Sequence, residues 1–170
     1  MKRIFFIGYM GAGKSFTARR LEEASGLQCV DLDDRIEQVA GRNIKTIFNK
    51  HGEAYFRRLE TEVLEQVLLD PSIAIVACGG GLTCTAGVGQ LIQDSGHVVH
   101  LDPPVEVILP RLLGNDDRPV LLDKGKSLTE SEIRGHKRER HPCYSFAHQH
   151  LVESPSEEDI QRWVIFLKSN

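Results

Sequence analysis

A glycine-rich stretch near the amino terminus carries residue types suited to binding phosphate. Gly8 stands five positions before Gly13-Lys14-Ser15, the spacing of a P-loop. Glycines let the backbone N–H groups of such a loop turn toward one concavity, and the following helix adds the positive end of its dipole. Lys14 would bring a charge to the terminal phosphates, and the Ser15 hydroxyl would ligate Mg²⁺. The alternative is a turn that binds nothing, but an apolar run before the motif and a helical pattern after it favour a nucleotide site.

Acidic residues follow a predicted strand at residues 27–30. In an extended segment Asp31 and Asp33 lie on the same side, and the carboxyl ends of strands border the ligand crevice in α/β proteins. Asp31 would then hold a water on the metal, and Asp33 would accept a hydrogen bond from a substrate hydroxyl. The alternative is that these carboxylates cap the next helix, the role that we expect for Asp34. Spacing alone leaves both interpretations of Asp31 and Asp33 open.

Further along the chain, an arginine and a glycine triplet suggest contacts with an anionic substrate. Arg57 and Glu60 lie three residues apart in a helical pattern, so the carboxylate can orient the guanidinium. Arg57 is then either a surface ion pair or a fork for a substrate carboxylate. The glycines at 79–81 follow a buried strand, where they either let a ligand approach the backbone or form a tight turn. Arg118, within a polar stretch at 114–126, is either a lid residue or an exposed arginine.

The cysteines and histidines show no metal-binding spacing. Cys29, Cys78, Cys84 and Cys143 include no Cys-x-x-Cys pair, so we expect reduced thiols. We interpret Cys78 and Cys84 as small buried apolar residues. The histidines from 136 to 150 match no zinc motif.

The composition is that of an ordinary globular protein. Hydrophobic residues make up 41% of the 170 residues, and charged residues make up 26%. The net charge of −3 argues against a nucleic-acid-binding surface. No apolar run has the length of a membrane span, and the sequence enters a strand directly, without a signal peptide. We therefore expect one domain over residues 1–170, a cytoplasmic location, and neither nucleic acid nor membrane as a partner.

Strand and helix patterns alternate along the whole chain. The predicted strands cover residues 4–7, 27–30, 73–77, 98–101 and 151–152. The predicted helices cover residues 14–25, 34–40, 44–50, 53–69, 88–94, 103–113, 129–144 and 156–167. This alternation predicts an α/β fold with a five-stranded parallel sheet, right-handed crossovers and helices on both faces.

Taken together, these stretches resemble shikimate kinase over nearly the whole chain. The resemblance is carried by ordered motifs at residues 8–15, 31–33, 41–48, 52–60, 79–81, 118–119 and 140–144. It implies a P-loop fold like that of nucleoside monophosphate kinases, with a substrate-binding region at about 33–60 and a lid at about 114–126. It also implies phosphorylation of the 3-hydroxyl of shikimate by magnesium-ATP, a step toward chorismate and the aromatic amino acids.

The resemblance implies a role for each candidate residue. The ATP-binding residues would be Gly11, Ala12, Gly13, Lys14, Ser15, Phe16 and Arg118. The shikimate-binding residues would be Asp33, Arg57, Gly79, Gly80, Gly81 and Arg140, with both arginines on the carboxylate. Mg²⁺ would be held by Ser15 and, through water, by Asp31, and the catalytic residues would be Lys14, Asp33 and Arg118. We expect a monomer whose partners are shikimate and ATP.

Two other functions share parts of this pattern. A related small-molecule kinase, such as gluconate kinase, would keep the P-loop but lack paired arginines together with the glycine triplet. A nucleotide-binding regulatory protein would need no catalytic groups, whereas Lys14, Ser15, Asp33 and Arg118 are all present.

Overall fold

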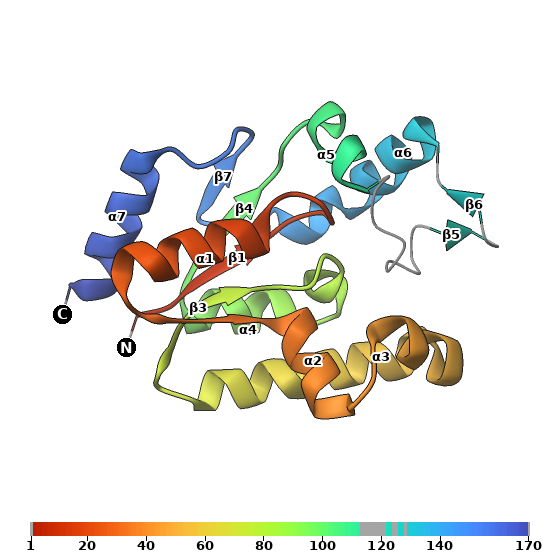
Figure 1. Ribbon diagram of the computed structural model, residues 1–170, viewed down its shortest axis with the longest axis horizontal. Helices are drawn as coiled ribbons and strands as arrows, with labels where there is room; N and C mark the ends of the chain where they lie inside the picture. The colour runs from red at the N-terminus through yellow and green to blue at the C-terminus, as the bar shows by residue number, and fades with distance from the viewer. Residues whose placement is uncertain (1, 113–121, 124–125, 128, 170) are drawn as a thin grey trace.

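A sheet of five parallel strands forms the centre of the protein (Figure 1). The computed structural model describes residues 2–112, 122–123, 126–127 and 129–169. The sheet has the order β2-β3-β1-β4-β7, and its strands are β1 (Ile4–Ile7), β2 (Gln28–Asp31), β3 (Ile73–Ala77), β4 (His97–Leu101) and β7 (Gln149–Leu151). Two short strands, β5 (Leu122–Asp123) and β6 (Lys126–Ser127), pair antiparallel apart from it. The predicted α/β fold with five parallel strands is confirmed.

Helices cover both faces of the sheet (Figure 1). One face packs against α1 (Lys14–Ser25) and α7 (Glu157–Lys168). The opposite face packs against α2 (Leu32–Ala40), α3 (Ile44–Leu69) and α4 (Val88–Ser95), with the short 3-10 helices η1 (Leu82–Cys84) and η3 (His141–Tyr144). A third apolar cluster joins α5 (Val105–Leu112) and α6 (Glu130–Arg140) to the loop after β1. No helix in the described part of the chain is both long and apolar enough to cross a bilayer.

The central strand β1 shows why these segments form a covered parallel sheet. Ile4 and Phe6 pack into the cluster that contains α1 and α7, whereas Phe5 and Ile7 pack into the cluster with α3 and α4. All four side chains are fully buried. Because successive side chains of a strand point to opposite faces, a strand covered on both sides must be apolar at every position. This requirement explains the unbroken apolar run before the P-loop motif.

The structure corrects several predicted boundaries. The segments at 44–50 and 53–69 form one helix, α3, which is broken at Gly52 by a positive φ of 77°. The helix predicted at 129–144, with an interruption or end near Pro142, ends at Arg140, where a short 3-10 helix containing Pro142 follows, because proline does not fit an α-helix interior. The last strand lies at Gln149–Leu151 rather than at 151–152.

Candidate functional site

The P-loop joins β1 to α1 and presents an uncapped helix amino terminus. Gly13, the residue before α1, has a φ of 96°, a left-handed conformation that glycine adopts without a steric penalty. No side chain caps α1, and its first turn contains no acidic residue. The first N–H groups of a helix have no partner within the helix, so this end is suited to an anion. The buried Lys14 Nζ donates to the carbonyl oxygens of Gly8 and Tyr9 at 2.9 and 3.0 Å, which holds the charge within the curve of the loop.

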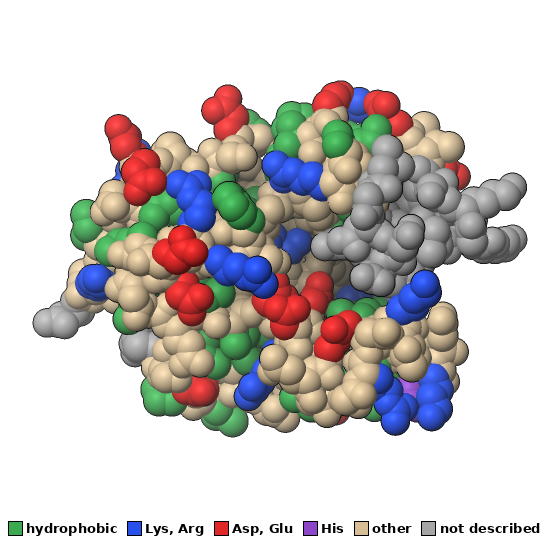
Figure 2. Space-filling view, in the orientation of Figure 1, with side chains coloured by type: hydrophobic (Ala, Val, Ile, Leu, Met, Phe, Trp, Pro, Cys, Tyr) green, Lys and Arg blue, Asp and Glu red, His purple; other side chains and the backbone are tan. Residues whose placement is uncertain are grey.

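A cavity of about 190 Å³ lies beside this loop. Its lining comprises Gly11, Gly13, Lys14, Ser15, Phe16, Asp31, Asp33, Cys78, Gly80 and Arg111. On the face of the molecule drawn in Figure 2, basic and acidic side chains lie next to one another around a central hollow. Most residues expected to bind ATP, and both aspartates expected near the metal and the substrate, therefore border one space.

The two aspartates reach the cavity by a different local structure from the one expected. Residues 32 and 33 are not extended, because α2 begins at Leu32 and Asp31 is its N-cap. One Asp31 carboxylate oxygen accepts from the Asp33 N–H at 2.9 Å. Asp31 therefore has the capping role that was expected for Asp34, and that expectation was wrong. Asp31 therefore caps the helix, as one alternative expected, and it also lines the cavity.

Ser15 and Asp31 together form a site suited to a hard cation. The Ser15 hydroxyl donates a hydrogen bond to the Asp31 carboxylate oxygen that does not cap α2. Mg²⁺ prefers oxygen ligands and usually keeps several waters alongside one or two protein groups and substrate phosphates. Among the described residues, no three His, Cys, Asp or Glu side chains are grouped to hold a metal by themselves. The Ser15 and Asp31 oxygens therefore fit Mg²⁺ that arrives with a nucleotide.

Arg57 is held by two carboxylates of its own helix, α3. Its Nη1 donates to Glu60 Oε2 at 2.7 Å, and its Nη2 contacts Glu53 Oε1 at 3.1 Å. Glu60 is 1% exposed, and its other oxygen, Oε1, has no hydrogen-bond partner among the described residues. Burial raises the pKa of Glu60 to about 7, against the opposing attraction of Arg57. The expected orientation of Arg57 by Glu60 is confirmed, and the pair is mostly buried.

The glycine triplet leaves room for these side chains. A Cβ on Gly81 would lie 2.5 Å from Arg57 Nη2 and 2.9 Å from its Cζ. A Cβ on Gly79 would overlap Glu60 Oε1 and would lie 3.0 Å from Asp33 Oδ1. The backbone after β3 is therefore closely approached by side chains of the protein itself, among them Arg57, Glu60 and Asp33, and the approach of a ligand to it stays a prediction.

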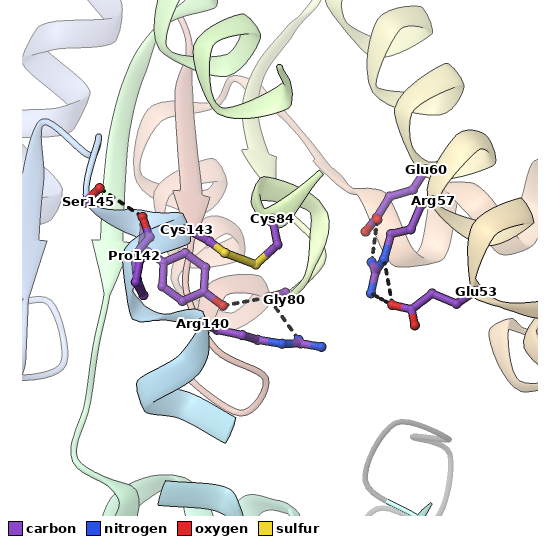
Figure 3. The surroundings of a disulfide bond; sticks show 10 residues. Glu53, Arg57, Glu60, Gly80, Cys84, Arg140, Pro142, Cys143 and Ser145 are labelled. Atoms are coloured by element: carbon purple, nitrogen blue, oxygen red, sulfur yellow. Dashed lines mark hydrogen bonds and ion pairs between the residues drawn. A yellow bond between two sulfur atoms is a disulfide. The ribbon is translucent and has the colours of Figure 1, made fainter. Parts of the chain in front are cut away.

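Gly80 links the P-loop to Arg140. A Cβ at Gly80 would lie 3.2 Å from the Met10 backbone nitrogen, so this backbone runs directly against the loop. The Gly80 carbonyl oxygen accepts from Arg140 Nη1 at 3.4 Å and from the Tyr144 hydroxyl at 2.7 Å. In Figure 3, Arg57 and Arg140 extend from different helices toward the same space. The two predicted arginines therefore face a common region beside the cavity.

The cysteine prediction was wrong for one pair. Cys84 and Cys143 form a disulfide bond with a Cα–Cα distance of 5.0 Å (Figure 3). Cys84 is exposed and is not a buried apolar residue. Cys29 and Cys78 are free thiols, and Cys78 is buried as expected. The pairing was not evident in the sequence because η1 and η3 become neighbours only through the order of the sheet.

Arg111 is a site residue that sequence reasoning missed. It lies in the last turn of α5, lines the cavity and donates from Nη1 to the Gly11 carbonyl oxygen at 3.0 Å. A basic residue in the last turn of a helix that precedes a polar loop was the only signal available. Arg118 and most of the predicted lid at 114–126 lie outside the described residues.

Comparisons with known proteins agree with this geometry. The family model described as "Shikimate kinase" matches residues 10–168. A shikimate kinase from Aquifex aeolicus is 34% identical over 99% of this chain and 97% of its own length. A shikimate kinase from Persephonella marina is 38% identical over 76% of this chain and 79% of its own. A solved structure of shikimate kinase from Acinetobacter baumannii in complex with shikimate has a TM-score of 0.85 and 31% identity, covering 98% of this chain and 93% of that one.

Proposed function

This chain belongs to the shikimate kinase family, and from that premise we propose how its residues perform the reaction. The reaction transfers the terminal phosphoryl group of ATP to the 3-hydroxyl of shikimate. We assign the P-loop cavity to the nucleotide and the region between Arg57 and Arg140 to shikimate. The observation that carries this assignment is Gly80, whose backbone abuts the loop on one side and accepts from Arg140 on the other.

The nucleotide side is assigned to the loop and the residues around it. The α1 N–H groups would bind phosphate oxygens, and Lys14 would turn from its two carbonyl acceptors toward the terminal phosphates. Ser15 and, through water, Asp31 would hold Mg²⁺, which when bound supplies positive charge to the transferring phosphoryl group. Gly11, Ala12, Gly13 and Phe16 would complete the ATP contacts, with Arg111 added from the structure. Arg118 keeps its proposed role as the lid cation on ATP.

The substrate side is assigned to the groups around the glycine triplet. Arg57 and Arg140 would bind the carboxylate of shikimate, because guanidinium groups match carboxylates with paired hydrogen bonds. Asp33, which borders the cavity and Gly79, would accept from the reacting hydroxyl and hold its oxygen in line with the phosphorus. Phosphoryl transfer depends mainly on positioning and charge neutralisation, so Asp33 need only orient this hydroxyl and receive its proton.

Gluconate kinase is the alternative small-molecule kinase. A gluconokinase from Sinorhizobium meliloti has a TM-score of 0.57 at 14% identity, a likeness of fold alone. The paired arginines favour a substrate whose carboxylate is fixed at one end and whose hydroxyl faces the P-loop. We also infer a monomeric enzyme working in the cytoplasm. Shikimate and ATP are its proposed ligands, with no nucleic acid or membrane partner.

A coupled assay of ADP release, with and without shikimate, tests this function, and Arg57→Ala tests the assignment. Removing one partner of a buried charged contact costs about 2 kcal/mol or more, so we expect shikimate affinity to fall about 30-fold or more. ATP affinity, measured by calorimetry, should not change. Arg58→Ala is the matched control, because Arg58 is exposed on the same helix. Shikimate-independent ADP release would contradict the function, whereas equal effects of both variants would contradict only the assignment.

Arg57→Ala leaves Glu60 without its partner, so folding must be checked by thermal melting. If this variant does not fold, Arg140→Ala provides the same test from α6, where the hydrogen bond of the guanidinium within the described residues is the long one to Gly80. A folded Arg140→Ala variant with unchanged shikimate affinity would overturn the carboxylate assignment.

A further inference from the structure

A disulfide bond joins the two segments that carry one side of the proposed substrate site. Cys84 comes three residues after Gly81, and Cys143 comes three residues after Arg140. The two cysteines are 59 positions apart in the sequence. In Figure 3 the bond lies beside Gly80 and at the base of Arg140. The covalent link therefore connects the glycine segment to the segment that begins with Arg140.

The hydrogen bonds between these two segments converge on a single atom. The Gly80 carbonyl oxygen accepts from Arg140 Nη1 at 3.4 Å and from the buried Tyr144 hydroxyl at 2.7 Å. The first of these is long for a hydrogen bond and contributes little. Arg140 itself is only partly buried, so its position depends on how firmly the start of η3 is held. The bond from Cys143 to Cys84 adds a covalent restraint on that position to the Tyr144 contact.

The bond is accessible to a reductant. Cys84 is exposed and Cys143 is half-buried, whereas the free Cys78 is 3% exposed. A thiolate of a dithiol reductant can attack the Cys84 sulfur, which breaks the bond and releases Cys143 as a thiolate that takes up a proton. The second thiol of the reductant then displaces Cys84, which also becomes a thiol. The Cys84–Cys143 disulfide is thus reduced by two electrons to two thiols, and the dithiol is oxidised to a disulfide.

We propose that the Cys84–Cys143 bond positions Arg140 for the substrate carboxylate and makes shikimate affinity depend on the redox state. The inference rests on the proposed function, because it uses Arg140 as a shikimate contact. In the oxidised protein the Arg140 segment is fixed beside Gly80, so binding immobilises little. After reduction, binding must also order this segment, and ordering a flexible side chain weakens affinity by about two- to tenfold. The P-loop contacts the Gly80 backbone, which belongs to the turn after β3 and is not part of the Arg140 segment, so we expect ATP affinity not to respond.

Steady-state kinetics of the full chain before and after dithiothreitol treatment provides the test. We expect reduction to raise KM for shikimate about two- to tenfold while KM for ATP stays constant. A Cys84→Ser, Cys143→Ser double variant should show the higher KM in both conditions. Cys29→Ser is the matched control, because Cys29 is a free cysteine on β2, and it should keep the wild-type response.

Thiol titration in denaturant establishes the starting state. Four cysteines with one disulfide leave two titratable thiols before reduction and four afterwards. Four thiols in the untreated protein, or equal shikimate KM values in two forms shown to be oxidised and reduced, would overturn the inference while leaving the kinase function intact. Absence of shikimate-dependent turnover in both forms would instead contradict the proposed function.

Discussion

Glu60 is a carboxylate whose environment disfavours its charged form. A carboxylate that is 1% exposed is expensive to ionise unless its oxygens are paired, and only Oε2 has a hydrogen bond, from Arg57. Burial raises its pKa to about 7, with Arg57 acting in the opposite direction. Glu60 therefore changes charge near neutral pH, and its charged form holds Arg57 more strongly than its neutral form.

This titration predicts a pH-dependent affinity for shikimate. As pH falls from 8 to 6, Glu60 gains a proton, its hold on Arg57 weakens, and KM for shikimate should rise by up to about fivefold. Glu60→Gln keeps the shape of the side chain but cannot ionise. The KM of this variant for shikimate should therefore be higher than that of the wild type and should change less between pH 8 and pH 6. Initial rates at several pH values measure both. Glu62→Gln, at an exposed position of α3, should follow the wild type, and a Glu60→Gln profile as steep as the wild-type one would refute the prediction.

At the scale of elements, the turn after β3 is fitted to the helix α3 beside it. A Cβ at Gly81 would meet the far end of the Arg57 side chain, which can move at small cost to the fold. The backbone of Gly81 has a φ of −114°, which alanine tolerates. Gly81→Ala should therefore raise KM for shikimate about tenfold or more with a change in melting temperature of only a few degrees.

Gly135→Ala is the control for the glycine prediction. Gly135 lies within α6, and a Cβ there would meet no atom within 4 Å. Alanine should stabilise the helix by about 0.5–1 kcal/mol without affecting KM. Thermal melting and kinetics of both variants distinguish them. A large loss of stability in Gly81→Ala, with normal affinity in the folded protein, would show that the glycine serves the turn and not Arg57.

The elements also show how far sequence reasoning could reach. The P-loop and the Arg57–Glu60 pair were predictable because each depends on neighbours within one loop or one helix. The Cys84–Cys143 bond and the Arg111 contact with Gly11 were not, because they depend on which helices the strand order places side by side. The capping role of Asp31 stayed one of two open interpretations for a local reason, since the acidic residues at 33 and 34 offered the same chemistry.

At the scale of the whole molecule, a buried histidine links stability to pH. His100 on β4 is 1% exposed, and its ring stacks on Tyr144 with a centroid distance of 4.6 Å. Its Nδ1 lies 3.0 Å from His150 Nδ1, and its Nε2 lies 3.9 Å from Asp102 Oδ1. Burial lowers the pKa of His100 from 6.5 to about 4. Asp102 opposes this shift, and the nearby His150, His141 and Lys137 add to it.

The sign of the resulting pH dependence follows from these pKa values. Between about pH 6.5 and pH 4 the unfolded chain binds a proton at His100 that the folded protein does not. The free energy of unfolding should therefore fall as pH falls through this range, with His100 contributing a slope of up to about 1.4 kcal/mol per pH unit. Urea unfolding at several pH values measures the slope, and His100→Phe, which keeps a ring against Tyr144, should make it shallower.

His51→Gln controls for the removal of any histidine. His51 is exposed on α3, so this variant should retain the wild-type slope. If His100→Phe and the wild type lose stability in parallel on acidification, other groups carry the acid sensitivity and the assignment to His100 fails.

The two edge strands of the sheet affect whether molecules of this protein can associate by strand pairing. β2 and β7 form the two borders and have only four and three residues. Another chain that paired with either edge of the sheet would find few unpaired backbone groups there, because both edge strands are short. Short edge strands are a common protection against aggregation. Concentrated solutions of the folded protein should therefore not aggregate by strand pairing, since each edge offers few backbone groups to another strand.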